Sequence, residues 1–532
     1  MARLFPELIF EAGVRRTERT ALIDAHGEVT YGGLAEQVER IGAGFRAVGL
    51  APRGRVGVYL DKRIETVAAF FGAAHAGGAF VPINPVLKAR QVHHILADCA
   101  VQVLVTAPER LESLREVLGD LPNLRTVILV GDGEAPEIAA DVLRWDDFLN
   151  AAEATGAPPR RVMEDDMAAI FYTSGSTGLP KGVVISHRNL VVGAESVAGY
   201  LENTPEDRIL SLLPLSFDAG FSQITTAAHA GAALVLHNYL LPNEVPRLCA
   251  KHGITGLTGV PPLWFQILRA RWTPEAAQSL RYFANTGGRM PRATLESLRR
   301  TFPNAKPFLM YGLTEAFRST YLDPAEVDRR PDSIGKAIPN AEVLVVKPTG
   351  ELAGPGEQGE LVHRGPLVSL GYWNDAARTA ERFKPAPARP EEIQVPEFAV
   401  WSGDIVRIDE EGFLYFIGRG DDMIKTSGYR VSPTEVEEAV YETGLVSEVA
   451  ALGVADDQLG QAIVLALVAK EGEALDTAAV LHHCREVLAA YMVPRRAVEM
   501  DSLPRSPNGK LDRPAIAERL DREQATARAQ AS

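Results

Sequence analysis

The sequence predicts an α/β protein. We expect a large N-terminal domain of doubly wound sheets with a small β-rich subdomain, and a smaller, mobile α+β domain at the C-terminus. Three observations support this prediction. The 532 residues are too many for a single hydrophobic core. Strand-like apolar runs alternate with helical patterns in the first part of the chain, which is typical of parallel sheets. Short strands split by Gly/Pro turns follow later, and a new helix start comes after them.

The alternation begins near the N-terminus. Residues 31–50 carry apolar side chains at helical spacing, and residues 56–60 form a strand-like run. The same alternation then predicts helices over 64–76 and 90–98, and strands over 80–83, 101–106, 208–214, 232–236 and 254–260. Strands that alternate with helices in this way predict a doubly wound parallel sheet.

The pattern of predicted elements changes in the last third of the chain. Short strands are predicted at 343–346, 359–363 and 413–417. We place a hinge at 418–422, which gives an N-terminal domain of residues 1–417 and a C-terminal domain of residues 423–532. Ser432 is a predicted N-cap, with Pro433 at the first helical position and Glu435 three residues after the cap. The C-terminal domain continues with predicted strands 446–454 and 462–469, and a helix 477–488 capped by Asp476.

Composition excludes several classes of protein. Hydrophobic residues make up 46% and charged residues 23%, as in ordinary soluble globular proteins. The net charge of −14 argues against a nucleic-acid partner, which usually meets a basic surface. The three cysteines form no CxxC pair, so we expect no disulfide framework or zinc site and a reducing, cytoplasmic location. We see no signal peptide and no apolar run of about 18 residues, so we expect no membrane span.

The most informative stretch is Tyr-Thr-Ser-Gly-Ser-Thr-Gly-Leu-Pro-Lys-Gly at 172–182. Its glycines let backbone N–H groups close on a bound anion, its hydroxyls add donors, and Lys181 adds a positive charge. This combination favours binding of a polyphosphate. It is not the common P-loop, because Gly182 rather than Ser or Thr follows the lysine. A flexible surface loop is the alternative, but apolar, strand-like runs flank this segment on both sides.

A second cluster is Tyr-Gly-Leu-Thr-Glu at 311–315, directly after an apolar run. Tyr311 can stack on a base, Thr314 can donate to a phosphate, and Glu315 can bind Mg²⁺ through its carboxylate. A tight turn at a strand end with a buried tyrosine would explain the same residues.

Three further clusters lie towards the C-terminus. Asp404 can accept hydrogen bonds from two vicinal ribose hydroxyls, and Arg419 can bind ribose or phosphate. The pair Gly420-Asp421 suits a backbone hinge, because glycine tolerates most backbone conformations. Lys510 stands at the tip of a rigid loop with Pro and Asn-Gly elements. The alternatives are a turn-forming aspartate, an exposed charged turn and a solvated lysine.

Together and in this order, the five clusters resemble those of the AMP-forming adenylating superfamily of acyl-CoA synthetases, amino-acid-adenylating enzymes and luciferases. The resemblance covers nearly the whole chain, and within the superfamily the chain looks most like the acyl-CoA ligases associated with exosortase systems. It implies an acid–thiol ligase that uses ATP, Mg²⁺ and coenzyme A, or the phosphopantetheine of a carrier protein. A carboxylate attacks the α-phosphate of ATP to give an acyl-adenylate and pyrophosphate. A thiol then displaces AMP.

The resemblance also implies roles for individual residues. Lys510 would bridge the carboxylate and the α-phosphate, with Thr314 at the α-phosphate and Glu315 on Mg²⁺. Asp421 would be the hinge. The thiol-transfer face would hold Lys425, Gly428 and Arg430. The nucleotide would contact Thr173, Ser174, Gly175, Ser176, Thr177, Gly178, Lys181, Gly287, Tyr311, Asp404 and Arg419.

Physical reasoning supports these roles. Adenylation brings an anion to a polyanion, so cations must offset the repulsion. A rigid site cannot also admit a bulky thiol, which explains a catalytic lysine on a mobile C-terminal lid.

The acyl pocket is expected to be lined by segments 216–222, 260–265, 285–288 and 316–318. The residues singled out there are Asp218, Phe221, Asn285, Gly288 and Arg318. Asp218 matches the position at which amino-acid-activating relatives keep an aspartate for the substrate's α-ammonium. We hypothesise that Asp218 pairs with an amino group, or with another cationic or hydroxyl group, of the substrate. A helix N-cap that faces away from the pocket is the alternative. Arg318 is expected to meet either a second substrate carboxylate or a neighbouring acid.

Three functions follow from the sequence. The leading one is an acyl-CoA ligase for a small carboxylic acid. The second is a stand-alone amino-acid-activating ligase that loads a separate carrier protein, since no phosphopantetheine serine motif follows Lys510. The third is a non-catalytic or oxygenase relative with the same fold, which complete motifs and the lack of a dedicated luciferin site disfavour.

Overall fold

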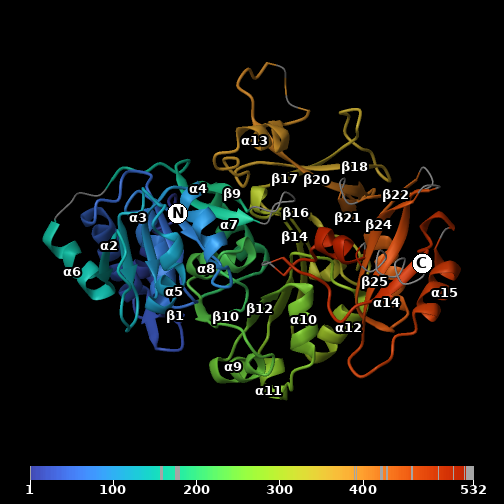
Figure 1. Cartoon of the computed structure of the whole chain (residues 1–532), viewed down its shortest axis with the longest axis horizontal. Coiled ribbons are helices and arrows are strands. Elements are labelled where there is room, and N and C mark those ends of the chain that lie inside the picture. Colours follow the sequence, from blue (N-terminus) through green and yellow to red (C-terminus); the bar gives the residue numbers. More distant parts are fainter. Residues whose placement is uncertain are drawn as a thin grey trace. The chain divides into compact units, whose positions relative to one another are not determined.

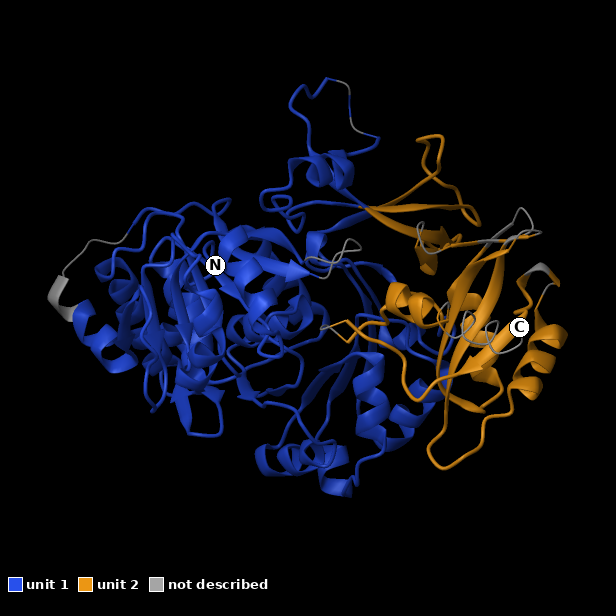
Figure 2. Ribbon diagram, viewed as in Figure 1, with its two compact units in different colours: residues 1–331, 335–343, 363–401 blue, residues 332–334, 344–362, 402–532 orange. Residues whose placement is uncertain are grey.

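The computed structural model describes residues 2–155, 160–173, 180–388, 390, 392–419, 423–426, 429–456, 459–488, 490–506, 509–520 and 522. The chain divides into two compact units (Figure 2). Unit 1 comprises Met1–Pro331, Gly335–Val343 and His363–Trp401, and unit 2 comprises Asp332–Ile334, Leu344–Val362 and Ser402–Ser532. Residues 420–422 of the expected hinge lie outside the described residues, so the predicted domain boundaries stay predictions.

Unit 1 contains two large sheets (Figure 1). In the described part of the chain, seven strands form the first sheet in the order β7-β6-β5-β3-β4-β8-β9. All neighbours in it are parallel except β8 and β9, which pair antiparallel on either side of segment 174–180. The strands are β3 (Arg55–Tyr59), β4 (Ala79–Pro82), β5 (Val101–Thr106), β6 (Thr126–Leu129), β7 (Asp141–Arg144), β8 (Met167–Thr173) and β9 (Lys181–Ser186).

The second sheet of unit 1 has the order β16-β15-β14-β13-β12-β10-β11-β1-β2 among the described strands. Its six middle strands, from β14 to β1, are parallel, and antiparallel strands complete both edges. The strands are β1 (Thr20–Ile23), β2 (Glu28–Thr30), β10 (Arg208–Ser211), β11 (Ala233–Leu236), β12 (Gly256–Gly259), β13 (Tyr282–Asn285), β14 (Lys306–Tyr311), β15 (Thr320–Leu322) and β16 (Lys336–Ala337).

Helices connect these strands, as the alternating pattern predicts. They are α1 (Glu7–Arg15), α2 (Tyr31–Ala47), α3 (Ile64–His75), α4 (Ala89–Asp98), α5 (Pro108–Leu114), α6 (Trp145–Thr155), α7 (His187–Tyr200), α8 (Asp218–Ala230), α9 (Glu244–His252), α10 (Pro261–Leu268), α11 (Pro274–Gln278), α12 (Arg292–Thr301) and α13 (Ala376–Arg382). One large apolar cluster combines residues of both sheets with α1, α2, α3, α7 and α8, and smaller clusters also lie in unit 1. The predicted doubly wound α/β class is therefore confirmed.

The core also contains a residue that we expected in the acyl pocket. Phe221 of α8 is fully buried and packs against the rings of Phe80 and Phe171, each with a centroid distance of 5.1 Å. Its side chain lies in this aromatic cluster because the buried helix α8 needs an apolar face toward the first sheet.

Residues 342–419 contribute a smaller sheet, as the short Gly/Pro-separated strands predict, in which β20 pairs antiparallel with β19 and β21. Its strands are β17 (Glu342–Val346), β18 (Gln358–Arg364), β19 (Phe383–Pro385), β20 (Phe398–Ile408) and β21 (Leu414–Arg419).

The C-terminal part of unit 2 is an α+β structure with its own apolar clusters. It contains β22 (Ile424–Thr426), β23 (Tyr429–Val431), α14 (Pro433–Glu442), β24 (Val446–Asp456), β25 (Gly460–Ala469), α15 (Thr477–Val487) and β26 (Arg496–Glu499). Asp476 caps α15 as predicted, with its carboxylate accepting from the Ala479 amide at 2.9 Å. Ser432 occupies the N-cap position of α14, but its hydroxyl donates to the Ile417 carbonyl instead of capping the helix.

Candidate functional site

The carboxyl ends of neighbouring parallel strands bring the predicted acyl-pocket segments together. Strand β12 leads into α10 and β13 ends at Asn285, whose side-chain amide donates to the Gly288 carbonyl at 2.8 Å. Gly287 has a φ of +71°, and a Cβ at this position would lie 3.0 Å from Val260 and 3.7 Å from the Phe217 ring. The start of α8, the start of α10 and the end of β13 therefore meet at one edge of the sheet, where ligands bind in open α/β sheets.

The adjacent strand β14 ends at Tyr311 and is followed by a short 3-10 helix, Thr314–Ala316. Thr314 is buried. Phe317 has a φ of +53°, a left-handed conformation that is rare for a bulky side chain and that often marks functional sites. The segment is a tight turn at a strand end, as the alternative interpretation expects, but Tyr311 is only partly buried. The roles of Tyr311, Thr314 and Glu315 in nucleotide binding stay predictions.

Glu315 is the centre of a hydrogen-bonded group in unit 1. The Lys181 ammonium donates to the Glu315 carboxylate at 3.2 Å and to the Tyr372 hydroxyl at 2.9 Å. Tyr372 in turn donates to the same Glu315 oxygen at 2.6 Å. Lys181 is the first residue of β9, so the lysine of the predicted polyphosphate loop does reach the predicted Mg²⁺ ligand. Tyr372 was not among the residues predicted from the sequence. The only local pattern that marks it is a pair of aromatic residues directly after Gly371.

The charges of this group follow from burial and pairing. Burial alone would raise the pKa of Glu315, but the Lys181 charge and the hydrogen bond from Tyr372 outweigh it and hold that pKa below its usual value. Burial lowers the pKa of Lys181, although Glu315 opposes this effect. Burial and the neighbouring Glu315 raise the pKa of Tyr372, which keeps its proton. A single ionised carboxylate fits Mg²⁺, which proteins usually bind through one or two carboxylates plus substrate phosphates.

His363 supports the ring of Tyr311 from β18. The two rings stack with a centroid distance of 6.1 Å and an interplanar angle of 16°. Neither ring nitrogen of the buried His363 makes a hydrogen bond to any described residue, and burial lowers its pKa to about 3. His363 is therefore a neutral platform at physiological pH. No sequence motif marked it.

Asp218 and Arg318 form a buried ion pair. The Asp218 carboxylate and the Arg318 guanidinium lie 3.7 Å apart, with side-chain exposures of 6% and 3%. Arg318 also donates to the Thr286 hydroxyl at 3.4 Å. Asp218 is the first residue of α8, whose N-cap is Phe217, so Asp218 is not the cap. Of the two partners expected for Arg318, the structure contains the neighbouring acid.

Asp404 and Arg419 form the corresponding polar pair in unit 2. They face each other across β20 and β21, and Arg419 donates to the Asp404 carboxylate at 3.1 Å. Asp404 is a buried strand residue rather than a turn residue, and Arg419 is exposed. A carboxylate held beside a guanidinium on a rigid sheet is suited to hydroxyls of a ribose.

Lys510 lies on the predicted tight loop, also in unit 2. The Lys510 carbonyl accepts from the Ser506 amide at 2.8 Å, and Arg505 and Leu511 form a β-bridge. The Lys510 side chain is exposed.

The remaining predicted residues lie on β8, β22 and β23 or outside the described residues. Thr173, the last residue of β8, has a buried hydroxyl with no hydrogen-bond partner among the described residues. Lys425 and Arg430 pair across β22 and β23, but their side chains are outside the described part. The predicted residues that lie outside it altogether are Ser174, Gly175, Ser176, Thr177, Gly178, Asp421 and Gly428.

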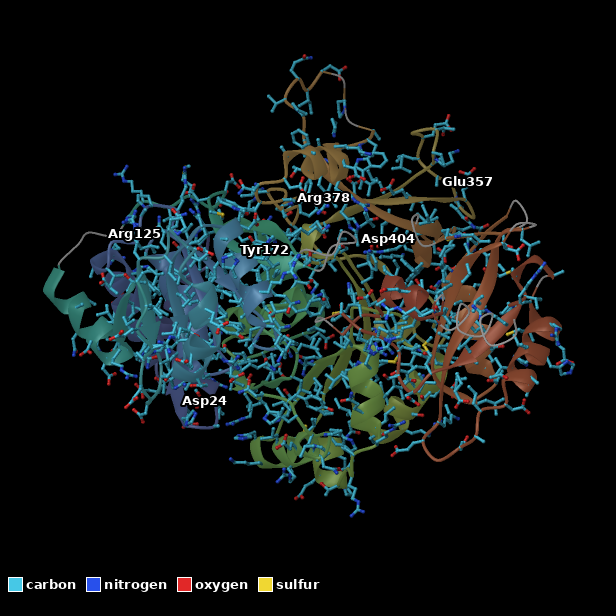
Figure 3. All side chains as sticks on the ribbon, viewed as in Figure 1. Asp24, Arg125, Tyr172, Glu357, Arg378 and Asp404 are labelled. Carbon is cyan, nitrogen blue, oxygen red and sulfur yellow. The ribbon has the colours of Figure 1, made fainter. Side chains whose placement is uncertain are left out.

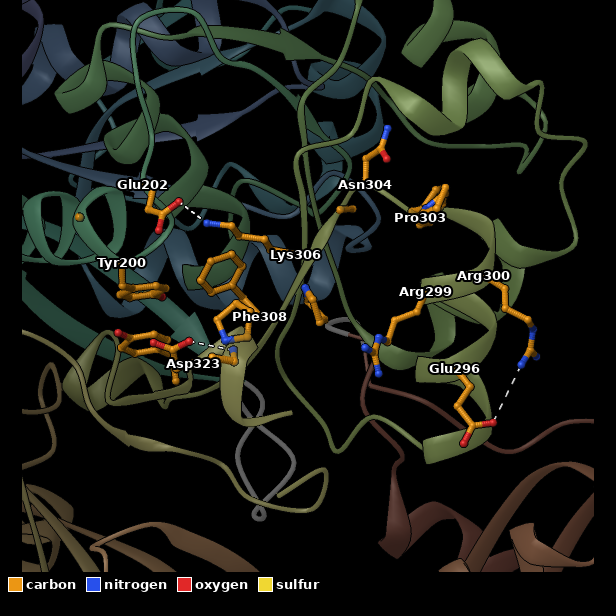
Figure 4. A pocket seen from close by; sticks show the side chains of 17 residues that line it. Tyr200, Glu202, Glu296, Arg299, Arg300, Pro303, Asn304, Lys306, Phe308 and Asp323 are labelled. Atoms are coloured by element: carbon orange, nitrogen blue, oxygen red, sulfur yellow. Dashed lines mark hydrogen bonds and ion pairs between the residues drawn. The ribbon is translucent and has the colours of Figure 1, made fainter. Parts of the chain in front are cut away.

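A separate hollow of about 970 Å³ lies at the amino end of β14, at the end of the strand opposite to Tyr311 (Figure 4). Two ion pairs lie among its lining residues. Lys306 bonds Glu202 at 2.6 Å, and Arg300 lies 4.0 Å from Glu296 (Figure 4). The hollow contains no predicted site residue.

Two further findings concern the described residues as a whole. No described helix is long and apolar enough to cross a bilayer. No group of three or more His, Cys, Asp or Glu side chains in the described ranges is placed to hold a metal ion.

Comparison with known proteins gives a consistent result. The sequence model for AMP-binding enzymes matches residues 9–373, and that for the C-terminal domain of these enzymes matches residues 435–510. The chain is 31% identical over 503 residues to an indoleacetate–CoA ligase of Aromatoleum aromaticum, covering 93% of each protein. It is 32% identical over 495 residues to an L-proline–[L-prolyl-carrier protein] ligase of Streptomyces coelicolor, covering 91% of each. Among solved structures, ATP-bound MatB from Rhodopseudomonas palustris superposes with a TM-score of 0.84 at 25% identity, covering 97% of this chain and 99% of MatB.

Proposed function

The chain belongs to the AMP-binding enzyme family, and we propose that it is an acyl-CoA ligase of that family. It is an acid–thiol ligase that activates a carboxylic acid with ATP by adenylation and then forms a thioester. The proposal adds that the acceptor is coenzyme A and that the acid carries no α-ammonium group.

The buried pair of Asp218 and Arg318 is the observation that carries this proposal. A substrate ammonium needs an unmatched carboxylate, because two cations cannot share one buried anion without a cost in desolvation and repulsion. Arg318 already balances Asp218 at 3.7 Å. The full-length likeness to an indoleacetate–CoA ligase, named for an acid without an amino group, supports the same choice.

In the first half-reaction, the residues at the strand ends orient ATP and the acid. Lys181 offsets phosphate charge, and Tyr311 packs against adenine with His363 behind it. Thr314 donates to the α-phosphate, and Lys510 neutralises charge where the carboxylate approaches. Glu315 would hold Mg²⁺, which when bound supplies positive charge to the phosphates.

In the second half-reaction, the C-terminal domain presents a different face. Asp404 and Arg419 hold the ribose, and a movement at Asp421 withdraws Lys510. Lys425, Gly428 and Arg430 then belong to the face that admits the thiol. The resemblance to exosortase-associated ligases stays a prediction.

The alternative function is an amino-acid ligase that loads a separate carrier protein. The likeness to the S. coelicolor prolyl-carrier ligase over nearly its full length favours it. In that case a substrate ammonium would have to displace Arg318 from Asp218.

An acid-dependent ATP–pyrophosphate exchange screen tests the choice. The panel pairs each α-amino acid with its analogue that lacks the amino group, and the best acid is then offered to coenzyme A and to a purified carrier protein. We expect the analogues to drive exchange and coenzyme A to accept the acyl group. Exchange driven by amino acids alone, or thioester formation on the carrier alone, would favour the alternative.

A further inference from the structure

Helix α13 is anchored directly beside the Glu315 group. Its Thr379 hydroxyl accepts from the Tyr372 amide at 3.0 Å. Gly371, with a φ of +104°, allows this close approach, because a Cβ there would lie 2.8 Å from the Thr379 methyl. The start of the helix is fixed by Asp375, whose carboxylate accepts from the Arg378 amide at 2.9 Å. The position of α13 is therefore tied to that of the tyrosine that bonds Glu315 and Lys181.

Two arginines follow one face of α13. Arg378 (Figure 3) and Arg382 are one turn apart, and residues at this spacing are neighbours on a helix surface. Both are partly buried. Arg378 lies 3.6 Å from Asp375, and Arg382 donates to the Trp401 carbonyl at 3.4 Å. These contacts orient the side chains without covering them completely.

Both arginines act electrostatically on the site. Lys181 and Tyr372 both experience the positive charges of Arg378 and Arg382. The two arginines thus lie within electrostatic range of both groups. Three positively charged side chains lie in this region: Lys181, Arg378 and Arg382. Lys181 pairs with Glu315, and Arg378 pairs with Asp375.

These cations lie near one another in a chain with a net charge of −14. Guanidinium groups bind phosphate oxygens through paired N–H donors, and they keep their charge at all physiological pH values. Pyrophosphate is the most highly charged product of the adenylation reaction. A cationic face next to Lys181 and Glu315 suits it better than it suits the acid or adenine.

We propose that Arg378 and Arg382 bind the β- and γ-phosphates of ATP and hold pyrophosphate as it leaves. When the carboxylate oxygen bonds to the α-phosphorus, the bond from that phosphorus to the bridging oxygen breaks, and its electron pair departs with pyrophosphate. The two arginines stabilise the charge that accumulates there. The proposal rests on the adenylation reaction above and assigns to α13 a role in leaving-group binding.

The test is direct binding of inorganic pyrophosphate and of tripolyphosphate to the full-length enzyme by calorimetry, without acid. We expect Arg378→Ala and Arg382→Ala each to weaken binding about tenfold, as for loss of one hydrogen bond to a charged group. Product inhibition by pyrophosphate should weaken by the same factor, with KM for the acid unchanged. Arg300→Ala is the matched control, because Arg300 is 71% exposed on α12 and paired within its own helix. It should bind as the wild type does.

Two conservative variants distinguish a loss of pyrophosphate affinity from a loss of folding stability. Arg378→Gln keeps a polar partner for Asp375, and Arg382→Lys keeps the charge but loses the paired donors. Each should retain the wild-type melting temperature and lose affinity for pyrophosphate, Arg382→Lys by less than Arg382→Ala. Pyrophosphate affinities within twofold of wild type in all four α13 variants would overturn the proposal. A wild-type enzyme that exchanges pyrophosphate with no acid would instead contradict the adenylation reaction itself.

Discussion

Replacing Arg318 by methionine gives the sharpest test of the acyl pocket. Methionine keeps much of the side-chain length and removes the charge. Asp218, which is 6% exposed, then loses the guanidinium that lies 3.7 Å from its carboxylate. The hydroxyl of Thr286 also loses its contact at 3.4 Å. The perturbation is therefore confined to one ion pair and one hydrogen bond.

The expected magnitude follows from this geometry. At 3.7 Å and an effective dielectric of about 20, the attraction between the two charges is about 4.5 kcal/mol. Desolvation of the two ions offsets most of this in the intact pair. Removing the guanidinium takes the paired cation away from a buried carboxylate, which costs about 3–5 kcal/mol. Arg318→Met should lower the melting temperature by several degrees, whereas the double variant Asp218→Asn/Arg318→Met should recover most of that loss.

The assay combines thermal unfolding with acid-dependent exchange. Arg318→Met removes the guanidinium that competes for Asp218, so phenylalanine and alanine should gain as substrates relative to 3-phenylpropionate and propionate, by tenfold or more for about 1.4 kcal/mol of new pairing. Asp218→Asn/Arg318→Met should show no such gain. The reasoning fails if the losses of stability in Arg318→Met and in Asp218→Asn alone add in the double variant, or if the preference for amino acids is unchanged in Arg318→Met.

Three further predictions concern the chemistry. Lys510→Ala should abolish adenylation from acid and ATP but largely spare thiolysis of a supplied acyl-adenylate, and equal loss in the two half-reaction assays would contradict the lid role. Tyr372→Phe removes the 2.6 Å bond to Glu315 and the acceptor for Lys181, so the KM for ATP should rise roughly tenfold with little change in melting temperature. The depressed pKa of Glu315 means that its ionised form stabilises the fold above its unfolded pKa of about 4.3, and that this stability is lost as pH falls through the lower folded value. The difference in melting temperature between wild type and Glu315→Gln should therefore be constant at neutral pH and shrink below about pH 4.3, and a difference that persists in more acidic solution would contradict it.

Much of the fold was predictable because its signals are local. Apolar runs such as residues 101–106 and the capped helix after Asp476 depend on the periodicity and caps of short segments. The order of the strands was not predictable in this way. The adjacency of β12, β13 and β14 is set by packing of the whole sheet, and it brings Gly287 against Val260.

The candidate site shows the same difference between what local signals predict and what packing sets. Residue types and local patterns were enough to identify the kinds of chemistry: a glycine- and hydroxyl-rich segment with Lys181, a carboxylate at Glu315, and a lysine on a tight loop at 510. The partners became known from the fold: Tyr372 for Glu315, and Arg318 for Asp218. This difference arises because residue type and spacing fix what a side chain can donate or accept. Its partner, by contrast, depends on which strand ends lie side by side once the apolar core has closed.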